Sequence, residues 1–379
     1  IFERTNARGI ELEISDLLKN HLFAKKVEDI ETTWDAIVNR ADGTLLRMLK
    51  YFYVSWGGYI LKSNLYRQLK TYAREVGPAR MTEDLDRFSR FYEIAREPDS
   101  NKVRAFFAER GLENIAKHQE NSDSICRSLQ ALKEFKVTQF IPPAYAIICA
   151  IEKLPEEQRN GNEKALVRLF TAFEKLHFIN NVVCDRVGNE VERFYADICK
   201  EFGTTNNLIG SINSFIQNMS KKRASLEEFE PRFAEISYEA SNLAILSYVF
   251  DRIMNADLKG GMRMDIYNPN PAIKIRNNNI EHFLAVNAAE SRNISKDALN
   301  NIGNLLYLNR YTNSGLGNIP PVEKIALLKS LKENEIQNNL YVREFVDKYG
   351  SMARDWNEEK IQDRARDMAR TSYNTVWNF

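Results

Sequence analysis

The sequence predicts a mainly α-helical protein, in which a helical array is followed by a small module of two strands and a helix, itself embedded in helices. Three features predict this. From the start of the chain to about residue 255, apolar residues recur at the three- and four-residue spacing of amphipathic helices. Over residues 254–286, glycines, two Asn-Pro pairs and alternating β-branched residues replace that spacing. From residue 353 onwards the helical spacing returns.

The helical array is predicted from long amphipathic segments separated by loops rich in Gly, Pro, Asn and Asp. The longest segments are residues 16–40, 90–112, 162–183 and 190–202. Ser225 and Glu228 have the spacing of a capping box in front of the next apolar run. His177 lies on an aromatic helical face, which favours a packed core histidine. We place a domain boundary near residue 222.

The mixed module is predicted from two short strand-like segments. The segment "IEHFLAV" (280–286) is the first, and "NIGNLLYLN" (301–309) is the second. The segment 320–334 then predicts a helix with proline at its start. Strand, loop, strand and helix follow one another over some fifty residues.

Composition limits the protein class. The chain has 379 residues, of which 44% are hydrophobic and 28% charged, so it is a soluble globular protein with room for two or three domains. The formal net charge is +1, so no global basic field points to nucleic acid, and such a partner must be held by local patches. No apolar run is long enough to span a bilayer and no signal peptide opens the chain, so we expect no membrane partner.

The four cysteines, Cys126, Cys149, Cys184 and Cys199, are far apart and form no CxxC pair. This spacing argues against a zinc knuckle and fits a reducing bacterial cytoplasm. The chain opens on Ile1 inside what looks like a structured element, so we interpret it as part of a longer protein.

The candidate chemistry lies in the adjacent pair Glu281 and His282. Phosphodiester hydrolysis needs a base that deprotonates water and a hard cation that neutralises the phosphate, and a histidine near neutral pKa suits the first task. Magnesium prefers oxygen ligands and retains several waters, so one carboxylate and one amide oxygen can hold it. The asparagines that could supply the amide are on the second strand and the loop into the helix: Asn304, Asn309, Asn313 and Asn318.

Adjacent residues on a strand point to opposite faces, so Glu281 and His282 can serve one site only where the strand ends and the chain bends. Taken alone, a Glu-His pair is usually two polar residues on an ordinary strand, and asparagine-rich loops are usually turns.

The order of these residues resembles the HNH-like nuclease domain at the C-terminus of GmrSD-type restriction enzymes. That domain typically has Glu-His-Ile-Leu-Pro, Gly-Asn-Leu-Thr-Leu-Leu, Asn-Ser, then Asn-x-Pro and a lysine. Here "IEH", "GNLLYL", Asn313, Asn318 and "IPPVEK" follow in the same order. Further matches lie downstream at Trp356, Ile361, Arg364 and Trp377. The resemblance therefore covers roughly residues 226–379 and implies a ββα-metal (HNH-like) fold for the module.

The start of the chain resembles the partner domain of the same enzymes. The segment "FERTNARGIELEISDLLKNHLF" is similar to the late signature of that domain. Its nucleotide-associated Asp-Gly-Gln-Gln-Arg motif would lie upstream of Ile1. The resemblance thus implies three parts: the end of an NTP-associated sensor domain (1–25), a helical middle domain (26–221) and an HNH-like nuclease domain (222–379). NTP would bind in the part upstream.

The resemblance implies a role for each matched residue. His282 is the general base, and Asn304 orients it or braces the loop. Glu281 and Asn313 are the ligands of Mg²⁺ or Mn²⁺. Supporting or DNA-binding roles fall to three more residues: Asn318, Lys324 and Arg364. The sequence departs from the family pattern after the histidine, where "FLAV" replaces the proline.

The sequence thus predicts an HNH-like DNA endonuclease or nickase, part of an anti-phage restriction enzyme that senses modified DNA. The modification would be methylated or glucosylated cytosine, as in GmrSD-type enzymes, or phosphorothioate, as in SspE-type proteins. Two alternatives stay open, namely a catalytically inactive DNA-binding module and a helical protein-interaction module. The oligomeric state, including a homo-oligomer, is also open.

Overall fold

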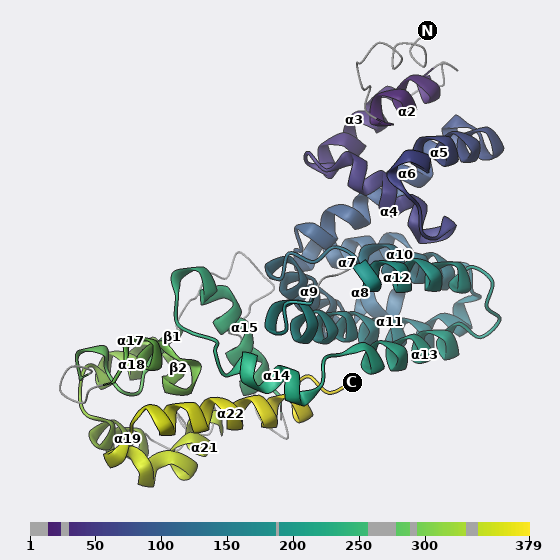
Figure 1. Cartoon of the computed structure of the whole chain (residues 1–379). Coiled ribbons are helices and arrows are strands. Elements are labelled where there is room, and N and C mark those ends of the chain that lie inside the picture. Colours follow the sequence, from purple (N-terminus) through teal and green to yellow (C-terminus); the bar gives the residue numbers. More distant parts are fainter. Residues whose placement is uncertain (1–13, 24–29, 187–188, 257–277, 289–293, 331–339) are drawn as a thin grey trace, which may run out of the picture. The chain divides into compact units, whose positions relative to one another are not determined.

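The computed structural model describes residues 14–23, 30–186, 189–256, 278–288, 294–330 and 340–379 (Figure 1). The chain divides into two compact units. The first comprises residues 1–174 and 187–219, and the second comprises residues 175–186 and 220–379. Of the predicted sensor segment 1–25, the described residues 14–23 form a helix, and residues 1–13 lie outside the description.

Helices make up the first unit, as predicted. They are α2 (Ile14–Phe23), α3 (Ile30–Ala41), α4 (Leu45–Gly57), α5 (Lys62–Val76), α6 (Pro78–Arg96), α7 (Ser100–Glu109), α8 (Glu113–Lys117), α9 (Gln119–Glu134), α10 (Ile141–Glu152), α11 (Glu156–His177), α12 (Asn189–Phe202) and α13 (Leu208–Lys222). α10 is buried along most of its length, which fits its almost wholly apolar sequence. α4 ends at Gly58 and α5 at Gly77, both with positive φ, the conformation that glycine adopts at least cost.

The second unit mixes short helices with one small sheet. Its elements are η2 (Phe178–Val183), α14 (Leu226–Phe233), η3 (Ala240–Asn242), α15 (Leu243–Met254), β1 (Asn278–His282), η4 (Val286–Ala288), α17 (Lys296–Asn300), η5 (Ile302–Asn304), β2 (Leu305–Asn309), α18 (Arg310–Leu316), α19 (Pro321–Ser330), α21 (Leu340–Tyr349), η6 (Gly350–Asp355) and α22 (Glu358–Thr375). The helices that this unit carries are each too short or too polar to cross a membrane, as are those of the first unit, within the residues that the structure describes.

Both predicted strand segments overlap a strand, and the two strands pair antiparallel in a two-stranded sheet. Each strand is shorter than its predicted segment, because β1 ends at His282 and residues 302–304 form the turn η5 before β2. Glu281 lies opposite Leu306, and His282, the last residue of β1, lies opposite Leu305. The helix predicted after the proline pair is α19, which begins at Pro321. The predicted strand, strand and helix are therefore present.

Two local predictions need correction. The segment around Asn313 was expected to be a loop, but residues 310–316 form α18, because Thr312 and Leu316, one helical turn apart, are buried and the helix packs against both strands. Ser225 does cap α14, but its side chain makes no capping hydrogen bond. The carboxylate of Glu228 instead forms an ion pair with Arg186, so the capping box does not close.

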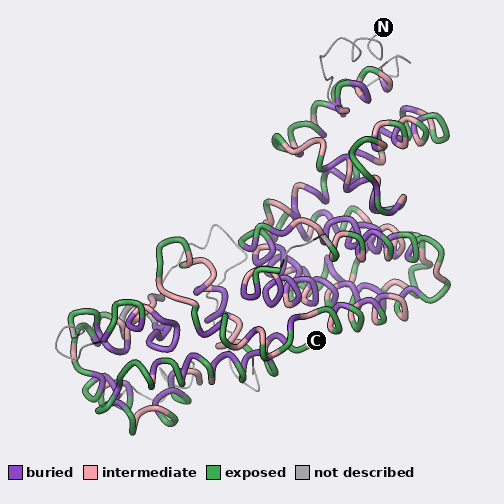
Figure 2. Tube along the Cα trace, viewed as in Figure 1, coloured by how far each residue is buried: buried purple, intermediate pink, exposed green. Residues whose placement is uncertain are grey.

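A continuous apolar core holds the sheet against the last helix. Phe283, Leu284, Leu306 and Leu308 pack in one cluster with Trp356 and other buried residues. α22, yellow in Figure 1, alternates buried and exposed residues along its length and contacts η5, the turn that leads into β2 (Figure 2). The residues that follow β1 are therefore held in a packed core.

Candidate active site

His282 closes strand β1 with its ring partly buried between polar and aromatic neighbours. Its Nε2 lies 3.1 Å from Oδ1 of Asn300, the last residue of α17. The ring of Tyr238 packs edge-on against it, with centroids 5.0 Å apart. Burial lowers the pKa of His282 below its ordinary value and outweighs the raising effects of the Asn300 hydrogen bond and the Glu281 carboxylate; the Lys324 ammonium adds the smallest effect, which also lowers the pKa. The imidazole is therefore neutral at pH 7.

The hydrogen bond to Asn300 selects one tautomer of this neutral ring. An amide oxygen only accepts hydrogen bonds, so the Nε2 of His282 carries the proton and donates it to Asn300. The Nδ1 nitrogen is then left with its lone pair. A neutral imidazole with one nitrogen fixed by a neighbour and the other basic is the form that a general base requires.

Glu281 points to a different neighbour. Its carboxylate forms an ion pair with the ammonium group of Lys324, on α19. Lys324 is fully buried and also donates a 2.8 Å hydrogen bond to the backbone carbonyl of His282. One lysine therefore ties the Glu281 side chain and the His282 backbone together at the strand end.

Asn313 lies on α18, which packs against both strands. Its Oδ1 is buried and has no hydrogen-bond partner within the described part of the chain. A buried acceptor left unpaired costs about 1–3 kcal/mol, so its retention calls for a reason. A bound cation would supply the missing partner. The carboxylate of Glu281 and the amide oxygen of Asn313 are both hard oxygen donors, so they fit Mg²⁺ or Mn²⁺.

No group of three His, Cys, Asp or Glu side chains close enough to hold a metal occurs among the described residues. The predicted ligand pair of one carboxylate and one amide is of another kind, because it leaves most coordination positions to water and phosphate. The fit of this pair rests on the unpaired Oδ1 of Asn313.

Asn304 has a different environment from Asn313. It is fully buried and uses both ends of its amide. Its Oδ1 accepts from the backbone N–H of Leu284 at 2.9 Å and from the indole of Trp356 at 3.2 Å. Its Nδ2 donates to the carbonyls of Leu284 and Leu299. Asn304 was predicted either to orient the histidine or to brace the loop. These hydrogen bonds support the second role, because they hold the chain that follows His282. The partner of the histidine ring is Asn300 instead.

A family comparison covers most of the second unit. Residues 224–371 match the model of the family described as GmrSD restriction endonucleases, C-terminal domain. This part of the chain is a GmrSD C-terminal domain. The family supports a function related to restriction endonucleases, with DNA as the substrate class. A search of curated proteins finds no match to the chain. The resemblance of the first residues to a sensor domain stays a prediction.

Arg364 of the GmrSD domain is a buried structural cation. Its guanidinium donates to the carbonyls of Gly303 and Leu305 at 2.7 and 2.9 Å and to the hydroxyl of Tyr341 at 2.6 Å. It also lies over the ring of Phe345, 4.6 Å from the centroid. Only 1% of its surface is exposed. In this conformation it supports β2 and cannot reach DNA.

Asn318 is exposed in the turn that joins α18 to α19. The side chain of Asn309 lies outside the described part. The structure thus brings Glu281, His282 and Lys324 together, places Asn313 on the adjoining helix, and keeps Asn304 and Arg364 in the core.

The sequence did not single out two neighbours of the histidine, Asn300 and Tyr238. Asn300 stands next to Asn301, whose side chain bonds to backbone atoms of Ala234 and Gly303. Nothing in the local sequence distinguishes the two asparagines. Tyr238 comes from a segment far from the motif, so only the folded chain brings it to the ring.

Proposed function

We propose that the GmrSD domain of this chain is an HNH-like nuclease that hydrolyses DNA phosphodiesters with the help of a divalent cation. The observation that carries the proposal is the neutral, partly buried His282, held by Asn300 through Nε2 at the end of β1. Its free Nδ1 is a base, and Glu281 and Asn313 place two hard oxygen donors on the elements around it.

His282 takes a proton from a water molecule at Nδ1, and the hydroxide forms a bond to the phosphorus. One P–O ester bond of the DNA backbone breaks, and the leaving alkoxide takes a proton from solvent water. Asn300 keeps the ring in place by accepting from Nε2–H, and it stabilises the imidazolium that forms. Lys324 holds the Glu281 carboxylate and the His282 carbonyl, which sets the position of both residues. Asn304 fixes Leu284, two residues after His282, because it accepts from the backbone N–H of Leu284 and donates to the Leu284 carbonyl.

Glu281 and Asn313 are the residues that would hold Mg²⁺ or Mn²⁺. Such an ion, when bound, neutralises charge on the phosphate and on the leaving oxygen. Lys324 would then share the Glu281 carboxylate with the ion. Because magnesium keeps most of its waters, two protein ligands suffice.

The wider role that we propose is DNA restriction against phage. In this proposal the domain acts on DNA that carries methylated or glucosylated cytosine, or phosphorothioate. A sensor part upstream of Ile1, with its NTP, would select that DNA, and the helical first unit would link the sensor to the nuclease.

A second candidate is a catalytically inactive DNA-binding module. The ion pair of Glu281 with Lys324 favours it, because the carboxylate already has a cationic partner. Such a module binds DNA in a salt-dependent way without metal and cleaves nothing.

Nicking of supercoiled plasmid separates the candidates. The chain is incubated with modified and unmodified plasmid in Mg²⁺, Mn²⁺ or EDTA, beside His282→Ala and the control His118→Ala, which changes an exposed histidine of the first unit. The nuclease proposal expects metal-dependent nicking that falls at least about a hundredfold in His282→Ala and is unchanged in His118→Ala. Equal nicking by His282→Ala, or DNA binding without nicking in any metal, contradicts it.

A further inference from the structure

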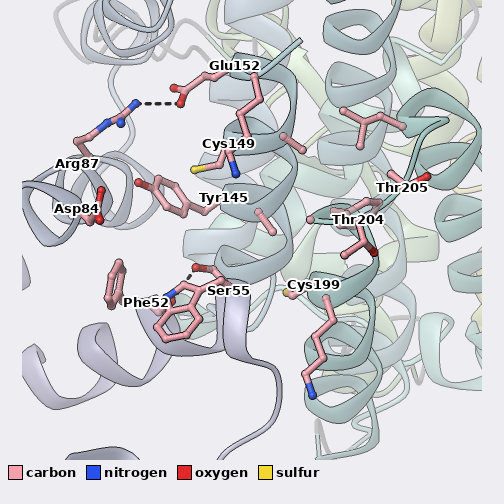
Figure 3. A pocket seen from close by; sticks show the side chains of 18 of the residues that line it. Phe52, Ser55, Asp84, Arg87, Tyr145, Cys149, Glu152, Cys199, Thr204 and Thr205 are labelled. Carbon is pink, nitrogen blue, oxygen red and sulfur yellow. Dashed lines mark hydrogen bonds and ion pairs between the residues drawn. The ribbon is translucent and has the colours of Figure 1, made fainter. Parts of the chain in front are cut away.

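The first unit contains a cavity of about 920 Å³ that takes no part in the candidate active site (Figure 3). Its wall comes from α4, α5, α6, α10 and α12 and from the loop at residues 203–205. Figure 3 shows Phe52 and Ser55 on one side of it and Thr204 and Thr205 on another. The volume lies within the range of small-molecule sites in proteins.

One wall of the cavity is a group of aromatic rings with an exposed indole. Trp56, at the end of α4, is 40% exposed. The ring of Tyr72 lies 4.7 Å from it at a tilt of 34°, and Phe52 lies 6.1 Å from it. An indole that is open on a cavity and backed by other rings is a platform for a planar aromatic ligand, because stacking needs a rigid apolar face.

The charged groups of the cavity are predominantly cationic. Four basic side chains line it, namely Arg80, Arg87, Lys153 and Lys200, against two acidic ones, Asp84 and Glu152. Both carboxylates have partners already. Asp84 accepts from Tyr72 and pairs with Arg80, and Glu152 pairs with Arg87 and Arg110.

Two of the cations have no acidic partner. Neither Lys153 nor Lys200 pairs with a carboxylate within the residues that the structure describes, and both are exposed. The ammonium group of Lys200 lies against Gly58, since a Cβ at that glycine would come 2.9 Å from its Nζ. Gly58 follows Trp56 by two residues, so Lys200 lies at the end of the helix that carries the exposed indole, and both side chains line the cavity.

The remaining polar groups suit an anion and argue against cysteine catalysis. Thr204 and Thr205, which follow Lys200 by four and five residues, also line the cavity; the Thr204 hydroxyl donates to the carbonyl of Glu201, and the Thr205 hydroxyl shares a hydrogen bond with Ser211. Burial raises the pKa of the Cys149 thiol to about 11, so it stays protonated and adds no negative charge.

We propose that this cavity binds a nucleotide, with its base stacked on Trp56 and its phosphate paired with Lys200. An aromatic ring system joined to an anion is the chemistry that an exposed indole beside an unpaired ammonium recognises. Lys153 and the two threonines complete the polar lining of the site. The nucleotide is either a free mononucleotide or one unit of a DNA strand, and both offer the same base and phosphate.

Tryptophan fluorescence tests the proposal directly. The other tryptophans of the chain, Trp34, Trp356 and Trp377, are at most 2% exposed, so quenching by a ligand reports on Trp56. The chain is titrated with dAMP, with ATP, with a single-stranded oligonucleotide, with adenosine and with ribose 5-phosphate. The variants are Trp56→Phe, Lys200→Gln and the control Lys164→Gln, an exposed lysine outside the cavity.

We expect dAMP or ATP to quench the fluorescence and adenosine and ribose 5-phosphate each to bind about tenfold more weakly, because each lacks one of the two contacts. Lys200→Gln weakens nucleotide binding by about tenfold, and Lys164→Gln does not change it. Quenching by the oligonucleotide and not by mononucleotides assigns the site to a DNA strand.

The absence of quenching by every ligand at millimolar concentration overturns the proposal. So does equal binding by Lys200→Gln and Lys164→Gln, or quenching that persists in Trp56→Phe. Plasmid nicking is not used in this test, so its failure would leave the nuclease proposal standing.

Discussion

Polar residues near strand β1 of the GmrSD domain have two different environments. On the side of α22, Asn304 and Arg364 are buried with their hydrogen-bonding groups paired to backbone and side-chain atoms. At the strand end, His282 keeps one basic nitrogen, and Asn313 keeps an unpaired oxygen within the described residues. The same sequence motif therefore supplies both a scaffold and a reactive edge. The difference teaches that a family motif is not a list of catalytic groups.

Among the substitutions in the buried core around Asn304 and Arg364, Gly303→Ala should cause the largest loss of stability. A Cβ at this glycine would lie 1.9 Å from the backbone oxygen of Ile361, which cannot move without shifting α22. We expect a loss of about 5 kcal/mol of unfolding free energy, measured by urea denaturation. Gly315→Ala is the matched control, because no atom lies within 4 Å of its Cβ position. It lies inside α18 and should gain about 0.5–1 kcal/mol. Equal stabilities of the two variants would refute the close contact.

Arg364→Met should be the next largest effect on the scaffold. It leaves the carbonyls of Gly303 and Leu305 without their donor, which costs about 3 kcal/mol in urea denaturation. Arg366→Met, on the exposed side of the same helix, should change the unfolding free energy by less than about 0.5 kcal/mol. A normally stable Arg364→Met that has lost DNA binding would instead make Arg364 a DNA contact.

A buried histidine, His177, should make the stability of the chain depend on pH. His177 is buried beside Asn181, as expected of a core histidine, and burial lowers its pKa from 6.5 to about 4. The unfolded chain then binds the extra proton between these values, so stability is full above pH 6.5 and declines as pH falls to 4. The loss reaches about 3 kcal/mol at the lower end. In His177→Gln, the unfolding free energy measured between pH 6.5 and 4 should therefore fall by about 3 kcal/mol less than in the unsubstituted chain. An equal fall in both would contradict the lowered pKa of His177.

Asn300→Ala should have the smallest effect, and it should change the nicking rate without changing the stability. Removing the acceptor of His282 Nε2–H frees the ring to rotate, which we expect to lower the nicking rate about tenfold at unchanged stability. Asn300→Asp keeps an acceptor oxygen and should retain more activity than Asn300→Ala. Equal loss in both variants would mean that Asn300 matters for packing and not for the histidine.

The sequence predicted that the module contains two short strands followed by a helix. Alternating and helical spacing predicted β1, β2 and α19, because each segment carries its own apolar pattern. The same spacing did not predict α18, whose Asn, Ser and Gly residues are typical of turns and become helical through burial against the sheet. It also could not separate Asn304 from Asn313 or find Asn300, because hydrogen-bond satisfaction depends on contacts between segments that only folding brings together.

The most direct test of this division is the specific nicking activity of Asn313→Ala beside Asn304→Ala, with the folded fraction of each measured by urea denaturation. The account predicts that Asn313→Ala loses about a hundredfold in metal-dependent nicking at unchanged or higher stability. Asn304→Ala should lose about 2–3 kcal/mol of stability while its folded molecules still nick DNA. Full activity in Asn313→Ala, or a stable and inactive Asn304→Ala, would contradict it.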